Sequence, residues 1–194
     1  AQHHPESPCL RFEHAALTYA DFNGLVNAFA AVLRQAGVGR EPFALVMENG
    51  PNLLAAQLAA AKTGAVAALI PPQLSGAALS LALRQSAARH VFTDATCLAR
   101  VVAPPESASL TIWGQGDPAL IPPHVEPLDA ALAAAPRHEP PAVAVRPDDV
   151  FLYLYSAAAG GVAKPALIQH RRFRLVGAGL SRLLGLHAED VVYA

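Results

Sequence analysis

Short apolar segments alternate with longer, helix-type segments along most of this 194-residue chain. The apolar segments have the length and composition of buried strands: residues 43–48, 65–70, 90–94, 110–113 and 149–155. Helix-type segments separate the first four of them. An order of strand, helix, strand, helix, strand predicts an α/β fold in which a mostly parallel sheet carries helices on both faces.

The expected helices begin and end at residues that favour helix ends. Thr18 and Asp21 form a capping-box pattern with Asp in the place of Glu, and Gly37 follows the end of that helix. Its apolar residues recur at spacings of three and four, which defines one buried face: Phe22, Leu25, Val26, Phe29, Val32 and Leu33. Asn49 and Pro51 open a second helix that Gly64 ends. Two short strands within 8–19, a helix over 75–86 and a short helix from residue 96 complete the pattern.

A proline-rich stretch interrupts this alternation. Residues 114–147 contain eight prolines, and within them only residues 128–134, LDAALAA, have a helical pattern. The stretch therefore reads as a connector and not as a core element. We expect a first α/β unit over 1–113, the connector over 114–147, and a strand pair with a following basic helix over 148–194, all within one domain.

The composition excludes several classes of protein. The chain is 53% hydrophobic and 15% charged, against a usual charged content of ~25%, and its net charge is −1. It can bury a sizeable core, but it has no basic footprint for nucleic acid. Cys9 and Cys97 form neither a disulfide framework nor a metal-ligand spacing, so free thiols in a reducing compartment are expected.

The longest apolar stretch, residues 53–70, does not have the pattern of a membrane span. Gln57, Lys62 and Gly64 interrupt it, whereas a spanning helix needs about 20 apolar residues. The polar N-terminal residues show no targeting segment. We expect a cytoplasmic protein without a transmembrane segment, which leaves room for peripheral membrane contact.

The segment YLYSAAAGGVAKPALIQH, residues 153–170, has the layout of a phosphate-binding loop between two strands. An apolar run stops at Ser156, small residues follow, and a single cation, Lys164, precedes the next apolar run. Such loops bind phosphate through backbone N–H groups, hydroxyl groups and a cation. Hydroxyl groups are nearly absent here, so three interpretations remain: a nucleotide site, a disabled nucleotide site, or a flexible turn.

Three stretches carry a resemblance to a known family. MENGPNLLAAQLAAAKTGAVAALI followed by LRQSAARHVFTD, and KPALIQHRRF after the loop, are similar to adenylate-forming enzymes, most of all to the fatty acid transport protein and very-long-chain acyl-CoA synthetase group. The resemblance covers about residues 8–194. It implies the α/β N-terminal subdomain of such an enzyme, with ATP, Mg²⁺, coenzyme A and a fatty acid as reactants: the acid and ATP give an acyl-adenylate, which coenzyme A captures as a thioester.

The loop departs from the family pattern, which is Thr-Ser-Gly-Thr-Thr-Gly-x-Pro-Lys. Counted back from Lys164, this chain keeps a hydroxyl at Ser156 and the glycine at Gly161, while Gly160 still permits a positive φ. The resemblance therefore implies four phosphate-binding candidates: Ser156, Gly160, Gly161 and Lys164. It implies no catalytic residue and no metal ligand here, because the family's adenine, ribose, metal and lid motifs have no counterpart in these residues.

Two hypotheses of different classes follow. In the first, the chain is the N-terminal region of an ATP-dependent fatty acid–CoA ligase, inactive when isolated, whose partner is the missing C-terminal half of the same enzyme. In the second, it is a catalytically dead adenylation-like module with a binding or scaffolding role. His170 and the cluster Arg171, Arg172 and Arg174 are most simply a helix start and a solvated helix face, with a coenzyme A or anionic-lipid contact as the alternative. Tyr153 and Tyr155 alternate on a strand and line the core or a cleft.

Overall fold

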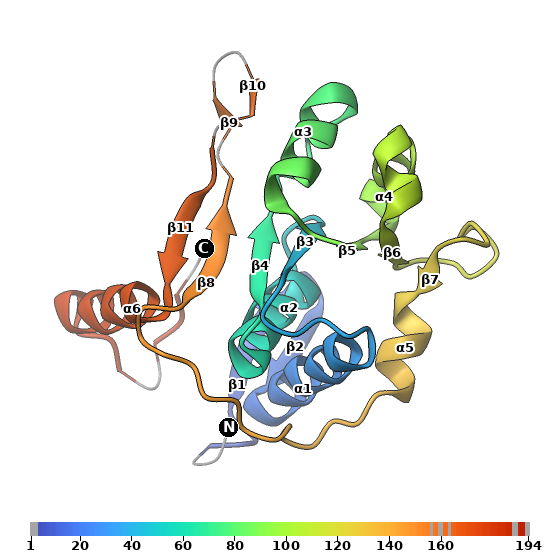
Figure 1. The fold of residues 1–194 in the computed structure, drawn as a ribbon. Helices are drawn as coiled ribbons and strands as arrows, with labels where there is room; N and C mark the ends of the chain where they lie inside the picture. Colours follow the sequence, from blue (N-terminus) through green and yellow to red (C-terminus); the bar gives the residue numbers. More distant parts are fainter. Residues whose placement is uncertain (1–3, 156, 159–160, 163, 188–189, 193–194) are drawn as a thin grey trace.

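One seven-stranded sheet organises the chain (Figure 1). The computed structural model describes residues 4–155, 157–158, 161–162, 164–187 and 190–192. The strand order is β11-β8-β4-β3-β5-β6-β7, and every neighbouring pair is parallel except β11 with β8. The strands are β3 (Pro42–Val46), β4 (Val66–Leu69), β5 (His90–Thr93), β6 (Thr111–Gly114), β7 (Glu126–Pro127), β8 (Val150–Leu154) and β11 (Ala166–Gln169). The predicted α/β class with a mostly parallel sheet is confirmed.

Helices cover both faces of this sheet. The helices of the described residues are α1 (Tyr19–Gln35), α2 (Pro51–Thr63), α3 (Gly76–Ser86), α4 (Ala95–Val102), α5 (Leu128–Ala134), α6 (His170–Leu184) and the short 3₁₀ helix η1 (Pro105–Ser109). The two cores contain α1, α2 and α5 on one face of the sheet and α3 and α4 on the other. Among the described residues, no helix combines the length and the apolar character that a membrane crossing requires. The expected helix starts are confirmed in outline, although α2 has Gly50 and not Asn49 as its N-cap.

Alternating side chains of the strands build two cores. Phe43 and Leu45 of β3 face the layer of α1, α2 and α5, whereas Ala44 and Val46 face the layer of α3 and α4. Phe92 of β5 lies in the first core, edge-on to Phe43 with ring centroids 5.5 Å apart. The period of two residues along each strand thus gives each helical layer its own set of apolar contacts.

The N-terminal residues form a separate hairpin of β1 (Pro8–Phe12) and β2 (Ala15–Thr18), as predicted. The predicted capping box at the start of α1 is present. The Thr18 hydroxyl accepts a hydrogen bond from the Asp21 backbone N–H at 3.1 Å, and the Asp21 carboxylate accepts one from the Thr18 N–H at 3.1 Å. The Thr18 hydroxyl lies 2.7 Å from the same carboxylate, and its hydrogen bond to that group, together with the one from the Thr18 N–H, lowers the pKa of Asp21.

The proline-rich stretch differs from the expectation of a connector without core elements. Its segment LDAALAA is helical as predicted, but Leu128 is fully buried in the first core and Leu132 is nearly so. Residues 126–127 add a strand to the sheet. A two-residue strand is too short for its alternation to stand out in the sequence, and the helical pattern alone did not show that α5 packs into the core. The division of the chain at 113/114 and 147/148 stays a prediction.

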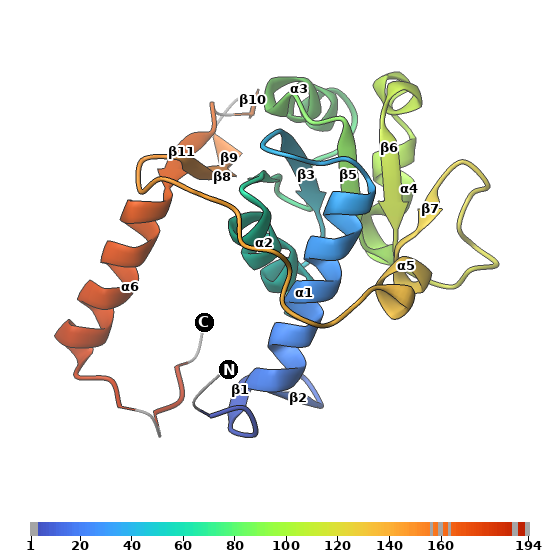
Figure 2. The same cartoon turned by 60° about the horizontal axis from the view of Figure 1, so that its bottom comes forward.

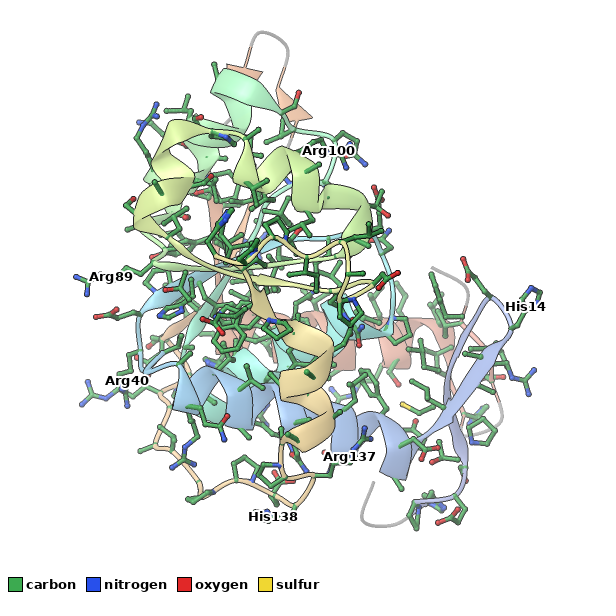
Figure 3. All side chains as sticks on the ribbon, turned by 90° about the vertical axis from the view of Figure 1, so that its right-hand side faces the viewer. His14, Arg40, Arg89, Arg100, Arg137 and His138 are labelled. Carbon is green, nitrogen blue, oxygen red and sulfur yellow. The ribbon has the colours of Figure 1, made fainter. Side chains whose placement is uncertain are left out.

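The rest of that stretch, residues 136–147, crosses α1 and α2 and is called the strap here (Figure 2). The Asn27 side-chain amide donates to the Arg137 carbonyl at 2.8 Å, and Arg137 lies against α1 (Figure 3). The Arg40 guanidinium donates to the Ala144 carbonyl at 2.6 Å. The strap therefore links α5 to β8 along a defined path and helps to fix where β8 enters the sheet.

Candidate functional site

The candidate loop leaves the sheet at the carboxyl end of β8. The β8 strand runs parallel to β4, so the loop emerges at the edge where β3, β4 and β5 also end. The β11 strand returns antiparallel to β8, and the pair Leu154 and Ala166 closes the base of the loop. Ligands of open α/β sheets bind outside the carboxyl ends of the strands. The predicted position of the loop, between two strands and at a carboxyl end, is confirmed.

A small hairpin lies inside the loop. The β9 strand (Ala157–Ala158) pairs antiparallel with β10 (Gly161–Val162), and β10 lies beside α3 (Figures 1 and 2). Sequence patterns did not predict these strands, because two residues of Ala or Gly carry no alternation of apolar and polar side chains. The loop is thus folded back on itself as a strand pair and is not a plain open turn.

The four predicted phosphate-binding residues are placed in part. Gly161 lies in β10 opposite Ala158, and Lys164 is an exposed residue between β10 and β11. Both therefore belong to the returning limb of the loop. The side chain of Lys164 forms no ion pair with any residue that the structure describes. Ser156 and Gly160 lie outside the described residues.

Tyr155 anchors the start of the loop. Its backbone N–H donates to the Leu69 carbonyl of β4 at 3.3 Å, and its buried hydroxyl donates to the Ala82 carbonyl of α3 at 3.3 Å. Burial raises the pKa of Tyr155 to about 12, so the phenol is neutral near pH 7. The sequence showed the alternation of Tyr153 and Tyr155, and both side chains do contact the core layer of α3 and α4. The sequence gave no sign of which group accepts the hydrogen bond of the Tyr155 hydroxyl, although a buried tyrosine hydroxyl usually has a hydrogen-bond partner.

The strand after the loop leads into α6 through an aromatic contact. The ring of His170 lies 5.1 Å from that of buried Phe151, and burial lowers the pKa of His170. The N-cap position belongs to Gln169, so His170 is the first helical residue and not the cap. Arg171 forms an ion pair with Asp148 at 2.8 Å. Arg172 and Arg174 are exposed, and within the described part of the chain their side chains have no ion pair.

The carboxylate of Asp94, at this edge of the sheet, is engaged in hydrogen bonds within the fold. Asp94 follows β5, and its two carboxylate oxygens accept hydrogen bonds from the backbone N–H groups of Glu48, at 2.6 Å, and Cys97, at 2.8 Å. Burial raises the pKa of Cys97 to about 11, so this thiol is protonated and not nucleophilic near neutral pH. No group of three His, Cys, Asp or Glu side chains in the described ranges is placed to hold a metal ion.

Two surface hollows lie around α4, away from the loop. One, of about 280 Å³, lies between α4 and residues 115–122, and the other, of about 440 Å³, lies between α4, η1 and His124. Their described linings include no residue of 153–169. Tyr155, β10 and Lys164 thus form a candidate site apart from both hollows, and its exposed cation is suited to an anion.

A mostly parallel sheet covered by helices on both faces, with a glycine-containing loop and an exposed lysine at its carboxyl edge, defines a class of α/β domain. Comparison with known proteins defines the family. The chain belongs to the AMP-binding enzyme family, whose profile matches residues 1–194. The resemblance to adenylate-forming acyl-CoA synthetases is thereby confirmed.

The relatives include transport proteins and ligases for fatty acids. The chain is 32% identical over 185 residues to mouse long-chain fatty acid transport protein 1, a match that covers 91% of this chain and 28% of the mouse protein. It is 27% identical over 188 residues to the medium/long-chain-fatty-acid–CoA ligase FadD6 of Mycobacterium tuberculosis, covering 95% of this chain and 30% of that ligase. The chain thus spans less than one third of the length of either relative.

The fold has a counterpart among solved structures. The inhibitor-bound N-terminal domain of FACL13 from Mycobacterium tuberculosis superposes with a TM-score of 0.68 at 28% identity, over 80% of this chain and 38% of that one. The predicted match to the N-terminal domain of an acyl-CoA synthetase is therefore confirmed at the level of the fold.

Proposed function

We propose that this chain is the N-terminal region of an ATP-dependent fatty acid–CoA ligase. The observation that carries the proposal is the exposed Lys164 beside the β9–β10 hairpin, at the edge of the sheet where α/β domains bind ligands. Membership of the AMP-binding enzyme family and the similarity to a fatty acid–CoA ligase support it. A cytoplasmic protein with peripheral membrane contact is part of the same proposal.

The chain's own role in that reaction is to bind the phosphates of ATP. Lys164 supplies the cation, and Ser156, Gly160 and Gly161 supply a hydroxyl and backbone N–H groups. In the proposed enzyme, the carboxylate attacks the α-phosphorus of ATP and releases pyrophosphate, and the thiol of coenzyme A then takes the acyl group and releases AMP. A bound Mg²⁺ would offset phosphate charge. The described residues offer no cluster for a metal ion, so this chain's contribution is assigned to phosphate binding alone.

Binding of ATP to the isolated chain should be weak. Where the family pattern has hydroxyl donors, positions 157 and 159 are Ala and position 160 is Gly. A hydrogen bond to a charged group is worth about 1.5–3 kcal/mol, so the loss of three donors removes most of the affinity that such a loop provides. We expect a dissociation constant in the millimolar range or weaker, which corresponds to about −4 kcal/mol.

A titration of the chain with MgATP, followed by NMR, tests the site. We expect millimolar binding with shifted signals at Gly161 and Lys164, and a loss of binding of about tenfold or more in Lys164→Met. Arg174→Met removes another exposed cation and serves as the control. Micromolar affinity in the unaltered chain, or equal affinity in Lys164→Met, would contradict the proposed phosphate site.

One observation favours the second candidate, a non-catalytic module. The Ser, the first Gly, both Thr and the Pro of the family loop are all replaced in residues 157–160 and 163. A chain that keeps the fold and loses the donors can serve for binding or scaffolding. The two candidates differ in whether a longer polypeptide of the same reading frame releases pyrophosphate in the presence of a fatty acid.

A further inference from the structure

The helix α6 carries an apolar stripe that other described residues leave uncovered. Its apolar residues recur at spacings of three and four, which places them on one face: Phe173, Val176, Leu180, Leu183 and Leu184. All five are exposed, and Leu180 keeps 50% of its surface accessible. No described residue of α6 is buried, although it is one of the longest helices of the chain. A helix with such a face normally packs it against another element.

The direction of the stripe follows from its first residue. The ring of Phe173 lies 5.2 Å from that of Phe151 in an edge-on contact, and Phe151 is buried in the core beneath α1 and α2. The stripe therefore faces the side of the sheet that α1 and α2 cover, and Figure 2 shows α6 beside that layer. A stripe that faces inward suits a polypeptide element packed between α6 and the rest of the domain. A flat bilayer surface would need it to face outward.

One of three basic side chains of α6 borders the stripe. Arg172 lies next to Leu183 on the helical wheel, and Arg174 and Arg182 lie on the opposite face. Within the described residues none of these three side chains has an ion pair. The stripe thus favours a partner surface that is mainly apolar, with an acidic group where it meets Arg172.

We propose that the α6 stripe is the interface for the polypeptide that makes up the remaining two thirds of an acyl-CoA ligase chain. The curated relatives are more than three times as long as the part that this chain matches, so they possess the residues to cover such a surface. The inference rests on the proposed function, because a protein of another class would have no such residues. In this proposal, α6 forms the contact between this α/β unit and the rest of the ligase chain.

Two variants of α6 test the interface. Leu180→Glu places a charge in the stripe, whereas Leu175→Glu places the same charge at a residue that is 70% exposed and lies outside the stripe. In this chain both should leave the melting temperature unchanged, since both sites are exposed to water. In a polypeptide extended through the rest of the reading frame, Leu180→Glu should lower the melting temperature by about 5 °C or more, and Leu175→Glu should not.

Hydrogen exchange gives a second readout. The amides of residues 176–184 should exchange about tenfold more slowly, or slower still, in the extended polypeptide than in this chain. Unchanged exchange, equal melting of the two variants, or a reading frame too short to supply the covering residues would overturn the proposal. So would self-association of this chain, or binding to phosphatidylserine vesicles, that Leu180→Glu abolishes and Leu175→Glu keeps.

The interface and the proposed function can fail separately. Protected α6 amides without fatty-acid-dependent pyrophosphate release would refute the ligase function and keep the interface. Pyrophosphate release with no difference between the two variants would refute the interface and keep the function.

Discussion

Lys62 Nζ lies 2.7 Å from both carboxylate oxygens of Glu139, although 77 positions separate the two residues. The same ammonium group donates to the side-chain oxygens of Asn23, at 2.9 Å, and Asn27, at 2.7 Å. One cation thus joins α1, α2 and the strap. The strap leads directly to β8, so this contact helps to hold the strand from which the candidate loop leaves the sheet.

Removing the cation should cost more than removing its carboxylate partner. Lys62→Met leaves two asparagine oxygens and a carboxylate without their donor, and we expect the free energy of unfolding to fall by about 1.5–3 kcal/mol. Glu139 is 64% exposed, so Glu139→Gln should cost less than about 1 kcal/mol. Urea denaturation measures both, with Lys164→Met as a control within ~0.5 kcal/mol of the parent. Equal costs for Lys62→Met and Glu139→Gln would count against the network.

The same contact should make stability depend on pH. Hydrogen bonding from Lys62 lowers the pKa of Glu139 below its ordinary value of 4.5. A carboxyl with a depressed pKa in the folded state stabilises the protein above 4.5, and this contribution is lost as the pH falls through the folded-state pKa. The difference in unfolding free energy between the parent and Glu139→Gln should be present at about pH 7 and absent by about pH 2. If this difference in unfolding free energy instead grew as the pH fell, the folded state would raise the pKa of Glu139, which would contradict the prediction.

A methyl group at Gly114 should destabilise the domain. A Cβ built at this residue of β6 meets Val125 Cγ1 at 2.9 Å and Leu98 Cδ1 at 3.1 Å, and both neighbours are buried. Overpacking of this kind costs about 1–3 kcal/mol, so Gly114→Ala should lower the unfolding free energy by that amount. Gly39→Ala has no atom within 4 Å of its Cβ and is the matched control. If thermal denaturation gives the two variants equal stability, β6 does not pack as closely against Val125 as the structure shows.

Loss of the Tyr155 hydroxyl should loosen the start of the loop. Tyr155→Phe removes the hydrogen bond to the Ala82 carbonyl of α3, with an expected cost of about 0.5–1.5 kcal/mol. Tyr153→Phe is the control on the same strand, and it should stay within ~0.5 kcal/mol. In NMR spectra of Tyr155→Phe, signals of β9 and β10 should shift as well. Unchanged signals there would mean that the hydroxyl does not position the loop.

The elements that the sequence predicted are those with strong local signals. Thr18 and Asp21 mark the start of α1, and alternation along 43–48 separates two cores, because side-chain period and capping are properties of neighbouring residues. The sequence did not predict the strap as an ordered element. Its contact between Lys62 and Glu139 joins residues far apart in the chain and leaves no local pattern. The strand at 126–127 was missed for a related reason: its pairing with Trp113 depends on the sheet that precedes it.

The sequence predicted where the candidate loop lies in the sheet, but it did not predict the secondary structure within the loop. The abrupt change from apolar to small residues after Tyr155 marks the end of a strand, and the parallel sheet then fixes the edge at which the loop lies. The β9–β10 hairpin had no signal, because two-residue strands are too short to show an alternation of apolar and polar side chains. The assignment of Ser156, Gly160, Gly161 and Lys164 to phosphate binding came from the family resemblance and stays a prediction.

Fatty-acid-dependent release of pyrophosphate from three polypeptides tests the central claim most directly. The first is this chain, the second carries the family loop through Ala157→Ser, Ala158→Gly, Ala159→Thr, Gly160→Thr and Ala163→Pro, and the third is the second one extended through the rest of its reading frame. Each missing donor to the leaving group costs about 10²–10³ in rate, but restoring the donors leaves adenine and ribose unpositioned in the second polypeptide. We expect release from the third polypeptide alone. Release from either of the first two, or none from the third, would contradict the assignment of this chain as the N-terminal region of a fatty acid–CoA ligase.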